Sequence, residues 1–178
     1  ALSGIAVCGL GHSHPAVAKA VAKQATVLTH CSNFFTIPNQ EMLAEKLCAA
    51  SGMSNVFFGN SGAEANEAAI KIARLHGHKK GIKLPTVLVM DNAFHGRTLA
   101  TLSASGGRRV QAGFEPLVRG FARAAFGDMT SLKTVADNNP SICALFVEPI
   151  QGEGGIRMAS TEYLQQLREF CDQRGWLL

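Results

Sequence analysis

Two uninterrupted runs of apolar residues constrain the fold of this 178-residue chain more than any other feature. Residues 85–90 read PTVLVM and residues 142–147 read ICALFV, and neither run alternates with polar residues. A strand without such alternation is buried on both faces, which is typical of a parallel sheet covered by helices on each side. Weaker strands are predicted at residues 119–125 and 55–58. We therefore expect an α/β fold with a parallel or mostly parallel sheet.

Helical patterns separate these runs. Apolar residues recur with helical spacing in residues 15–29, 38–51, 63–78, 128–138 and 160–174. In the third of these helices Ala65, Ala69 and Ile72 predict the buried face, and Glu67 is spaced to pair with Lys71. In the second helix Met42, Leu43 and Leu47 are predicted to point inward. The Gly-rich segment 103–113 is expected to be a long loop.

The length corresponds to about one domain. Within it we expect a helical approach at residues 1–52 and the α/β sheet portion at residues 53–178. A content of 47% apolar and 17% charged residues excludes a disordered chain. No apolar run approaches the roughly 20 residues that span a bilayer, and the first residues lack the basic start of a signal peptide.

The charge and the cysteine content indicate which binding partners and which cellular compartment to expect. The net charge of +4 comes from basic residues scattered along the chain, so nucleic-acid binding is not indicated. No membrane partner is expected either. The five cysteines are odd in number, widely spaced and without a CxxC pair. This pattern indicates a reduced, cytoplasmic setting.

The segment after residues 55–58 has the sequence expected of an anion site. Residues 58–65 read FGNSGAEA, a Ser-Gly turn followed at once by a helix. The backbone N–H groups of Gly62 and Ala63, with the Ser61 hydroxyl, would form a cradle for a phosphate at the helix N-terminus. The alternative is an ordinary cap, in which Ser61 caps the helix and Glu64 closes a capping box. The two interpretations are compatible, and both stay open.

Residues after the two buried runs are candidates as well, because ligands of open α/β sheets bind beyond the carboxyl ends of the strands. Phe94, His95 and Arg97 follow the first run, where an aromatic ring could stack on a flat ligand and a guanidinium could pair with a carboxylate. Glu148 and Glu153 follow the second run. The alternatives are a solvated loop with Phe94 packed inward and a Gly-rich turn with exposed carboxylates.

A weaker signal lies near the start of the chain. Residues 9–14 read GLGHSH and resemble a dinucleotide-binding fingerprint, but His14 replaces the third Gly and no long apolar strand precedes it. His12 and His14 could ligate a metal ion, yet no third ligand has a recognisable spacing. A hydrogen-bonded turn explains the segment better, and no metal site is expected.

Four motifs occur in one order along the chain: GLGHSHPAV, FFGNSGAEANEAAIKIAR, FHGRTLATLSASG and FVEPIQGEGG. In this order and spacing the chain resembles, over its whole length, the class III (fold type I) pyridoxal-phosphate-dependent aminotransferases, and most of all the acetylornithine-type members. The resemblance implies part of the large, cofactor-binding domain of a transaminase. Such an enzyme would move an amino group from N-acetylornithine, or a related ω-amino donor, to 2-oxoglutarate in arginine and ornithine metabolism.

The resemblance also implies cofactor contacts. The Ser61–Ala63 segment matches the residues that bind the cofactor phosphate, with Ala63 standing where many relatives have Thr. Phe94 matches the aromatic residue that stacks on the pyridine ring, and His95 lies beside it. Glu148 matches an acid on the ring-nitrogen side. The implied cofactor is pyridoxal 5′-phosphate.

Substrate contacts are implied in the same way. Arg97 matches the Arg that grips the substrate α-carboxylate in acetylornithine-type enzymes. Glu153 matches an acid that helps ornithine-type relatives switch between the two half-reactions. Phe34 and Phe35 lie where relatives place aromatic residues that shape the substrate site. Ornithine, succinylornithine and GABA aminotransferases remain alternatives within the family.

By the same resemblance, the Schiff-base Lys and the ring-nitrogen Asp belong to segments beyond Leu178, so the chain holds no catalytic residue of its own. We therefore expect a fragment, without an N-terminal segment and the C-terminal half, that is inactive alone and forms a homodimer when full length. Two other classes of function stay open. One is a non-catalytic α/β domain that binds a phosphate ligand, and the other is a nucleotide-binding oxidoreductase that uses residues 9–14.

Overall fold

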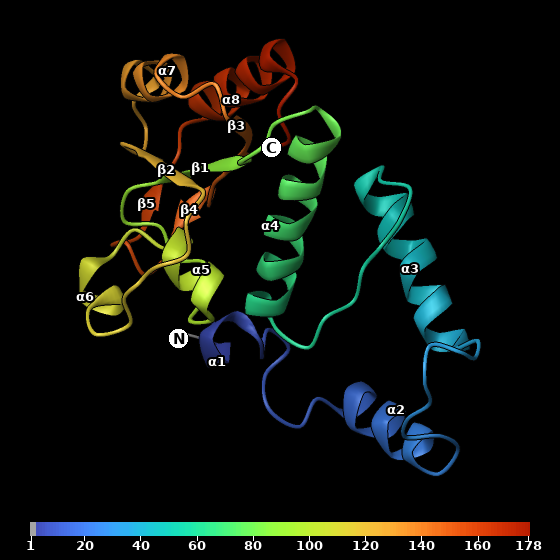
Figure 1. The fold of residues 1–178 in the computed structure, drawn as a ribbon. Helices are drawn as coiled ribbons and strands as arrows, with labels where there is room; N and C mark the ends of the chain where they lie inside the picture. Colours follow the sequence, from blue (N-terminus) through green and yellow to red (C-terminus); the bar gives the residue numbers. More distant parts are fainter. Residues whose placement is uncertain (1–2) are drawn as a thin grey trace. The chain divides into compact units, whose positions relative to one another are not determined.

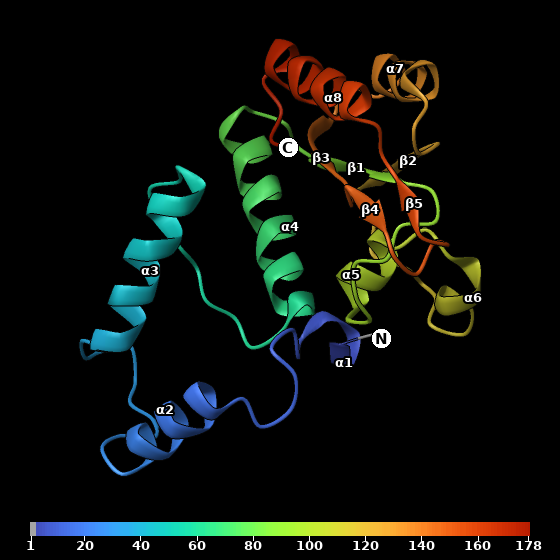
Figure 2. The same cartoon turned by 180° about the vertical axis from the view of Figure 1, so that it is seen from behind.

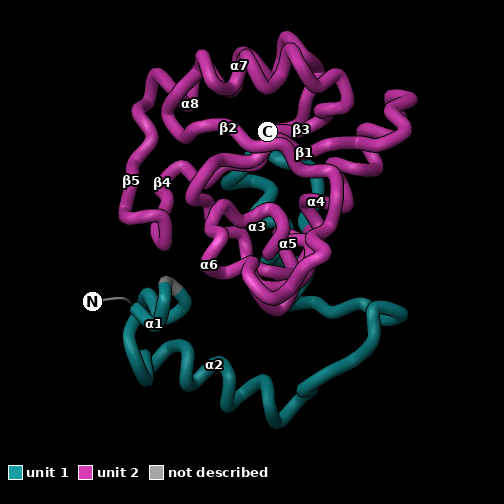
Figure 3. Tube along the Cα trace, turned by 60° about the vertical axis from the view of Figure 1, so that its left-hand side comes forward, with its two compact units in different colours: residues 1–56 teal, residues 57–178 magenta. Residues whose placement is uncertain are grey.

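The computed structural model describes residues 3–178, which divide into two compact units. The first unit ends at Val56, and the second spans Phe57–Leu178 (Figure 3). The first is helical, whereas all strands of the described chain lie in the second. No helix among the described residues combines the length and the apolarity needed to cross a bilayer.

The first unit contains a short helix and two longer ones. They are α1 (Ser3–Ala6), α2 (Pro15–Ala25) and α3 (Pro38–Ser51). Both longer helices begin with Pro, whose fixed φ suits the first helical position. α2 ends four residues before the predicted end, whereas α3 ends as predicted, with Gly52 at a φ of 71°.

The predicted inward face of α3 is wrong. Met42, Leu43 and Leu47 are 42–49% exposed, and no described residue of α2 or α3 is buried. The helical spacing is correct, but the described part of the first unit supplies no second layer that would cover these side chains.

The second unit is built on a parallel sheet, as the two apolar runs predict. Its strands are β1 (Thr86–Met90), β2 (Phe121–Ala124) and β3 (Ile142–Phe146), in the order β2-β1-β3. Val87 pairs with Phe121 on one side and with Ala144 on the other. All five residues of β1 are buried, which fits a central strand covered on both faces.

Helices cover both faces of this sheet (Figures 1 and 2). They are α4 (Gly62–Lys79) and α5 (Leu99–Ala104) on one face, and α7 (Met129–Asp137) and α8 (Thr161–Arg174) on the other. Alternate side chains of β1 belong to different cores: Val89 packs in a cluster with Ile70 of α4, and Leu88 in a cluster with Leu132 and Leu167 of α7 and α8. The predicted α/β class is therefore confirmed.

Three smaller elements complete the second unit. They are α6 (Arg108–Gln111) and an antiparallel hairpin of β4 (Ile150–Gln151) and β5 (Arg157–Met158). The loop predicted at residues 103–113 is wrong in part, because α5 ends and α6 lies within it. The strand predicted at residues 55–58 is also wrong. That run has no regular secondary structure, because no strand of the described chain pairs with it.

The buried face of α4 differs from the predicted one by one residue. Ile70, Ala73 and Gly77 are buried, whereas Ile72 is 57% exposed. The reason is a close approach at Gly77, where a β-carbon would lie 2.6 Å from the Pro85 Cβ. Because only Gly fits that gap, its position sets the rotation of the helix on the sheet.

Candidate functional site

The predicted site segments of the second unit meet at the carboxyl end of the sheet. Residues 91–97 follow β1, and Glu148 follows β3. The N-terminus of α4 lies beside the first segment: a β-carbon at Gly96 would be 3.1 Å from the Ala63 Cβ. In addition, Asn66 Nδ2 donates a hydrogen bond of 2.8 Å to the His95 carbonyl. The fold thus brings together three segments far apart in the sequence.

The N-terminus of α4 has the predicted Ser cap, and it leaves two N–H groups without an acceptor among the described residues. Ser61 Oγ accepts from the Glu64 N–H at 3.2 Å, as a cap does. The Glu64 carboxylate accepts from the Asn60 N–H, one residue earlier than in a standard capping box. Among the described residues the N–H groups of Gly62 and Ala63 have no acceptor, and open space lies where a Gly62 side chain would stand. These N–H groups are free to bind an anion.

A carboxylate ties the second segment to the third. The Phe94 N–H donates to Glu148 Oε2 at 3.0 Å, across 54 residues of sequence. Burial raises the pKa of Glu148 above its ordinary value, and bonds from the N–H groups of Phe94 and Gly152 partly oppose this rise. Glu148 therefore fixes the backbone that carries the half-buried Phe94 ring.

His95 is a buried, neutral histidine. Its ring stacks on Phe146, with centroids 4.1 Å apart and planes at 15°, and the residue is 3% exposed. The backbone N–H of His95 donates to Ser105 Oγ at 2.9 Å. The ring atom Nε2 has no partner among the described residues. Burial, and then the charge of Arg123, lower the pKa of His95 to about 4. The imidazole is thus uncharged near neutral pH.

Other residues, which the sequence did not single out, tie together the segments around the site. Gln151 Nε2 donates to the Asp91 carbonyl at 2.8 Å, and Arg123 Nη2 donates to the Ser103 carbonyl at 2.6 Å. A β-carbon at Gly154 would lie 2.6 Å from the Asn92 carbonyl oxygen, so the Gly-rich turn is needed for close backbone contact. Such contacts between distant segments have no local sequence signature.

Arg97 and Glu153 are on the surface of the second unit. Both are exposed, and neither makes a side-chain hydrogen bond or ion pair with the described residues. Next to Arg97, Thr98 Oγ1 donates to Glu67 of α4, which is the contact that Glu67 makes in place of the predicted pair with Lys71. The open positions of Arg97 and Glu153 leave their charges available to a ligand.

The remaining candidates lie in the first unit. Phe34 and Phe35 are 94% and 70% exposed. Residues 9–14 form turns, without a preceding strand, so the dinucleotide fingerprint lacks its structural context. Among the described residues no group of three His, Cys, Asp or Glu side chains could hold a metal ion.

A parallel α/β sheet, a helix N-terminus with free N–H groups and an aromatic residue beyond a strand end together define a class of phosphate-binding α/β proteins. The chain belongs to a particular family within it, because the model of the class III aminotransferases matches residues 1–178. This membership confirms the family that the four motifs indicate. Members of this family use pyridoxal phosphate as cofactor.

The names of similar proteins support the same family assignment. The chain is 56% identical, over its whole length, to an acetylornithine aminotransferase of Nitrosomonas europaea, of which it covers 45%. Among solved structures it is similar to N-acetylornithine aminotransferase from Stenotrophomonas maltophilia, with 36% identity and a TM-score of 0.81 over 99% of this chain and 43% of that one.

The chain is also similar to a second solved structure. An ornithine aminotransferase from Toxoplasma gondii, with partial occupancy of PLP at its active site, is 33% identical with a TM-score of 0.93. That match covers 99% of this chain and 42% of the other. The chain therefore spans less than half the length of the relatives that it matches.

Proposed function

We propose that this chain is the cofactor-phosphate-binding part of an aminotransferase that moves an amino group from N-acetylornithine to 2-oxoglutarate. The names of the relatives support the donor, since the 56% identical protein and a similar solved structure are both acetylornithine aminotransferases. A keto acid as amino acceptor follows from the aminotransferase family. The choice of 2-oxoglutarate is part of the proposal.

One observation carries the proposal: the N–H groups of Gly62 and Ala63 have no acceptor among the described residues, and Ala63 lies beside Gly96 in the segment that carries Phe94. An anion cradle next to an aromatic ring suits pyridoxal phosphate, which needs a phosphate site and a ring contact. Ser61, Gly62 and Ala63 would hold the phosphate, and Phe94 would lie against the pyridine ring. When bound, the cofactor supplies the electron sink for the amino-group transfer.

The other residues have supporting roles in this proposal. Glu148 holds the Phe94 backbone, so the ring keeps its orientation. His95 stays neutral and adds no charge beside the cofactor. Arg97, which is exposed, would bind the α-carboxylate of the donor through a charge-assisted pair. Glu153 would act at the same carboxyl end of the sheet during the exchange of donor and acceptor.

We also propose that the protein forms a homodimer and that it is cytoplasmic. A homodimer is supported by the apolar side chains that the first unit exposes, such as Val21 at 63% and Phe35 at 70%. A cytoplasmic enzyme is supported by the five cysteines, all of which are free. Sedimentation of the purified protein tests whether it is a homodimer.

The experiment that tests the function is a transaminase assay of the protein expressed from its complete reading frame. The donors would be N-acetylornithine, succinylornithine, ornithine and GABA, with 2-oxoglutarate as acceptor. We expect the highest kcat/KM with N-acetylornithine. Cofactor binding without transfer from any donor would favour a non-catalytic binding domain instead.

Arg97→Ala sharpens this assay. We expect the KM for N-acetylornithine to rise at least tenfold while the absorbance of the bound cofactor persists, because removing one partner of a buried charge-assisted pair costs roughly 2–5 kcal/mol. Arg109→Ala, which removes an exposed guanidinium on α6, is the matched control. An unchanged KM in Arg97→Ala would remove this residue from the substrate site.

A further inference from the structure

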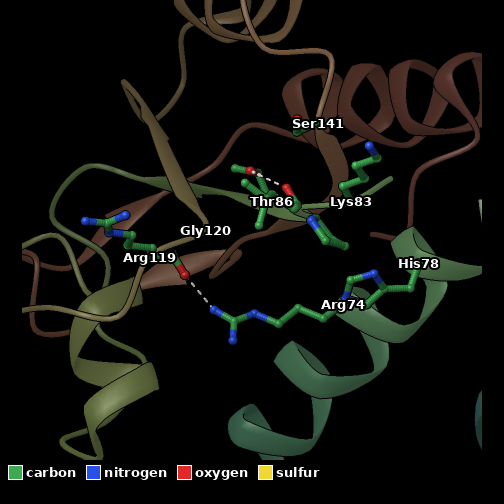
Figure 4. Close-up of a pocket in the computed structure, with 9 residues that line it drawn as sticks. Arg74, His78, Lys83, Thr86, Arg119, Gly120 and Ser141 are labelled. Carbon is green, nitrogen blue, oxygen red and sulfur yellow. Dashed lines mark hydrogen bonds between the residues drawn. The ribbon is translucent and has the colours of Figure 1, made fainter. Parts of the chain in front are cut away.

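A cavity lies at the opposite edge of the sheet from the site described above. Thr86, Gly120 and Ser141, at the amino ends of β1, β2 and β3, all line it (Figure 4). Its volume is about 520 Å³. Since a strand of five residues is about 16 Å long, this cavity is separate from the Gly62 cradle at the carboxyl ends.

The charges around this cavity are of one sign. The lining consists of Arg74, His78, Lys83, Leu84, Pro85, Thr86, Arg119, Gly120 and Ser141, and none of these is acidic. The two ion pairs of the described chain, Arg168–Asp172 and Arg174–Asp137, lie on other elements. The basic side chains that line the cavity are thus without an acidic partner among the described residues, which favours the binding of an anion there.

Arg74 is held in position at this site. Its Nη2 donates to the Arg119 carbonyl at 2.6 Å, and its guanidinium lies 5.8 Å from the centroid of the Phe121 ring. Figure 4 shows the Arg119 side chain pointing away, so that the carbonyl is what faces Arg74. The remaining N–H groups of Arg74 stay available, already oriented for a ligand.

Two glycines keep the cavity open and its walls fixed. A β-carbon at Gly120 would lie 3.4 Å from Arg74 Nη2 and 3.1 Å from the Pro85 carbonyl oxygen. Gly77 allows α4 to pack directly on Pro85, which fixes the helix that carries Arg74. The Arg74 guanidinium and the buried Pro85 therefore belong to a rigid frame, and the exposed Leu84 borders it.

We propose that this cavity binds an organic phosphate, with the phosphate on Arg74 and Lys83 and the body of the ligand against Leu84 and Pro85. A guanidinium and an ammonium group are the usual partners of phosphate oxygens. A volume of about 520 Å³ is in the range of small-molecule sites and exceeds what a free phosphate fills. This site is independent of the proposed aminotransferase function.

Calorimetric titration with ADP tests the site. The protein, expressed from its complete reading frame, is first saturated with pyridoxal phosphate so that the Gly62 cradle is filled. We expect one ADP per chain, and a dissociation constant at least tenfold higher in Lys83→Gln and Arg74→Gln. Lys71→Gln, an exposed Lys of α4 outside the cavity, is the matched control and should bind like the unaltered protein.

Further titrations test whether binding depends on the charge of the ligand, on its size, or on the folding of the variants. Adenosine should not bind, and inorganic phosphate should bind more weakly than ADP. Lys83 is exposed and its side chain has no hydrogen-bond partner among the described residues, so Lys83→Gln keeps the test valid even if Arg74→Gln unfolds the protein. Equal affinity of Lys83→Gln, equal affinity for inorganic phosphate, binding of adenosine, or no heat at 5 mM ADP (roughly 3 kcal/mol of binding free energy at that limit) would each overturn the proposal.

Discussion

At the scale of single residues, the candidate site depends on polar groups that are buried together with aromatic rings. His95 has a ring stacked on Phe146 and an Nε2 atom without a partner among the described residues. A buried imidazole of this kind resists protonation, because the charged form loses its hydration. The same burial makes the site sensitive to acid.

Stability is expected to fall as the pH decreases from about 6.5 to about 4. The pKa of His95 is about 4 in the folded chain and 6.5 in the unfolded one, so the unfolded chain binds the extra proton in this window. The contribution is complete above pH 6.5 and is lost as the pH falls, by about 3 kcal/mol. Urea unfolding of the cofactor-free protein at pH 7, 5.5 and 4 measures it.

His95→Phe is the informative variant for that experiment. It keeps a ring on Phe146 but has no group that titrates, so its stability should change less between pH 7 and pH 4. His30→Phe, which replaces an exposed His of the first unit, should leave the pH dependence as it was. Identical pH profiles for His95→Phe and the unaltered protein would show that another group causes the loss.

Glu148 gives a second prediction at this scale. Glu148→Ala leaves the Phe94 N–H without its acceptor, which costs about 1–3 kcal/mol when the group is buried. Because the Phe94 ring then loses its fixed position, we also expect a weaker affinity for pyridoxal phosphate. Glu148→Gln retains an oxygen acceptor and should keep most of both. Thermal unfolding and cofactor titration measure these effects, and an equal loss in both variants would contradict the hydrogen-bond explanation.

The sequence predicts the residues of the site better than their contacts. Phe94, His95 and Glu148 are recognisable because each follows a buried strand, where α/β proteins bind ligands. Ser105 and Asn66 carry no such signal, although they bind the His95 N–H and carbonyl. Their partners are 10 and 29 residues away, and the fold alone brings them together.

At the scale of helices and strands, the full burial of a strand is easier to predict from the sequence than the rotation of a helix about its axis. The two apolar runs and the Gly-terminated helices appear where they are predicted, since strand length and end signals are local. The rotation of α4 is not local. It follows from the contact of Gly77 with Pro85 and Cys143, and the Ala-rich sequence offers two nearly equivalent apolar faces.

Two isoleucines of α4 test this rotation. Ile70 is 2% exposed and packs against the sheet, whereas Ile72 is 57% exposed. Ile70→Ala should therefore destabilise the protein by roughly 2–5 kcal/mol, and Ile72→Ala by less than about 1 kcal/mol. Urea unfolding of both variants makes the comparison with identical chemistry on one helix. A larger loss for Ile72→Ala would restore the face that the sequence predicts.

At the scale of the whole molecule, the second unit has a separate apolar layer on each face of its sheet. Each layer contains one buried cysteine: Cys143 on the α4 face and Cys171 on the α8 face. The two thiols thus report on the two layers independently. The arrangement of strands and helices on both faces follows from the sequence, whereas the content of each layer depends on the strand register.

Alkylation of these thiols is expected to be slow until the layers open. Burial raises the pKa of Cys171 from 9.0 to about 11, which lowers its reactive thiolate about a hundredfold at pH 8. Burial raises the pKa of Cys143 as well, and its Sγ donates to the Ala73 carbonyl at 3.2 Å. Mass spectrometry of peptides labelled with iodoacetamide, with and without urea, measures both rates. Half-buried Cys48 should change less on unfolding, and native labelling of Cys171 as fast as labelling in urea would contradict a closed α8 layer.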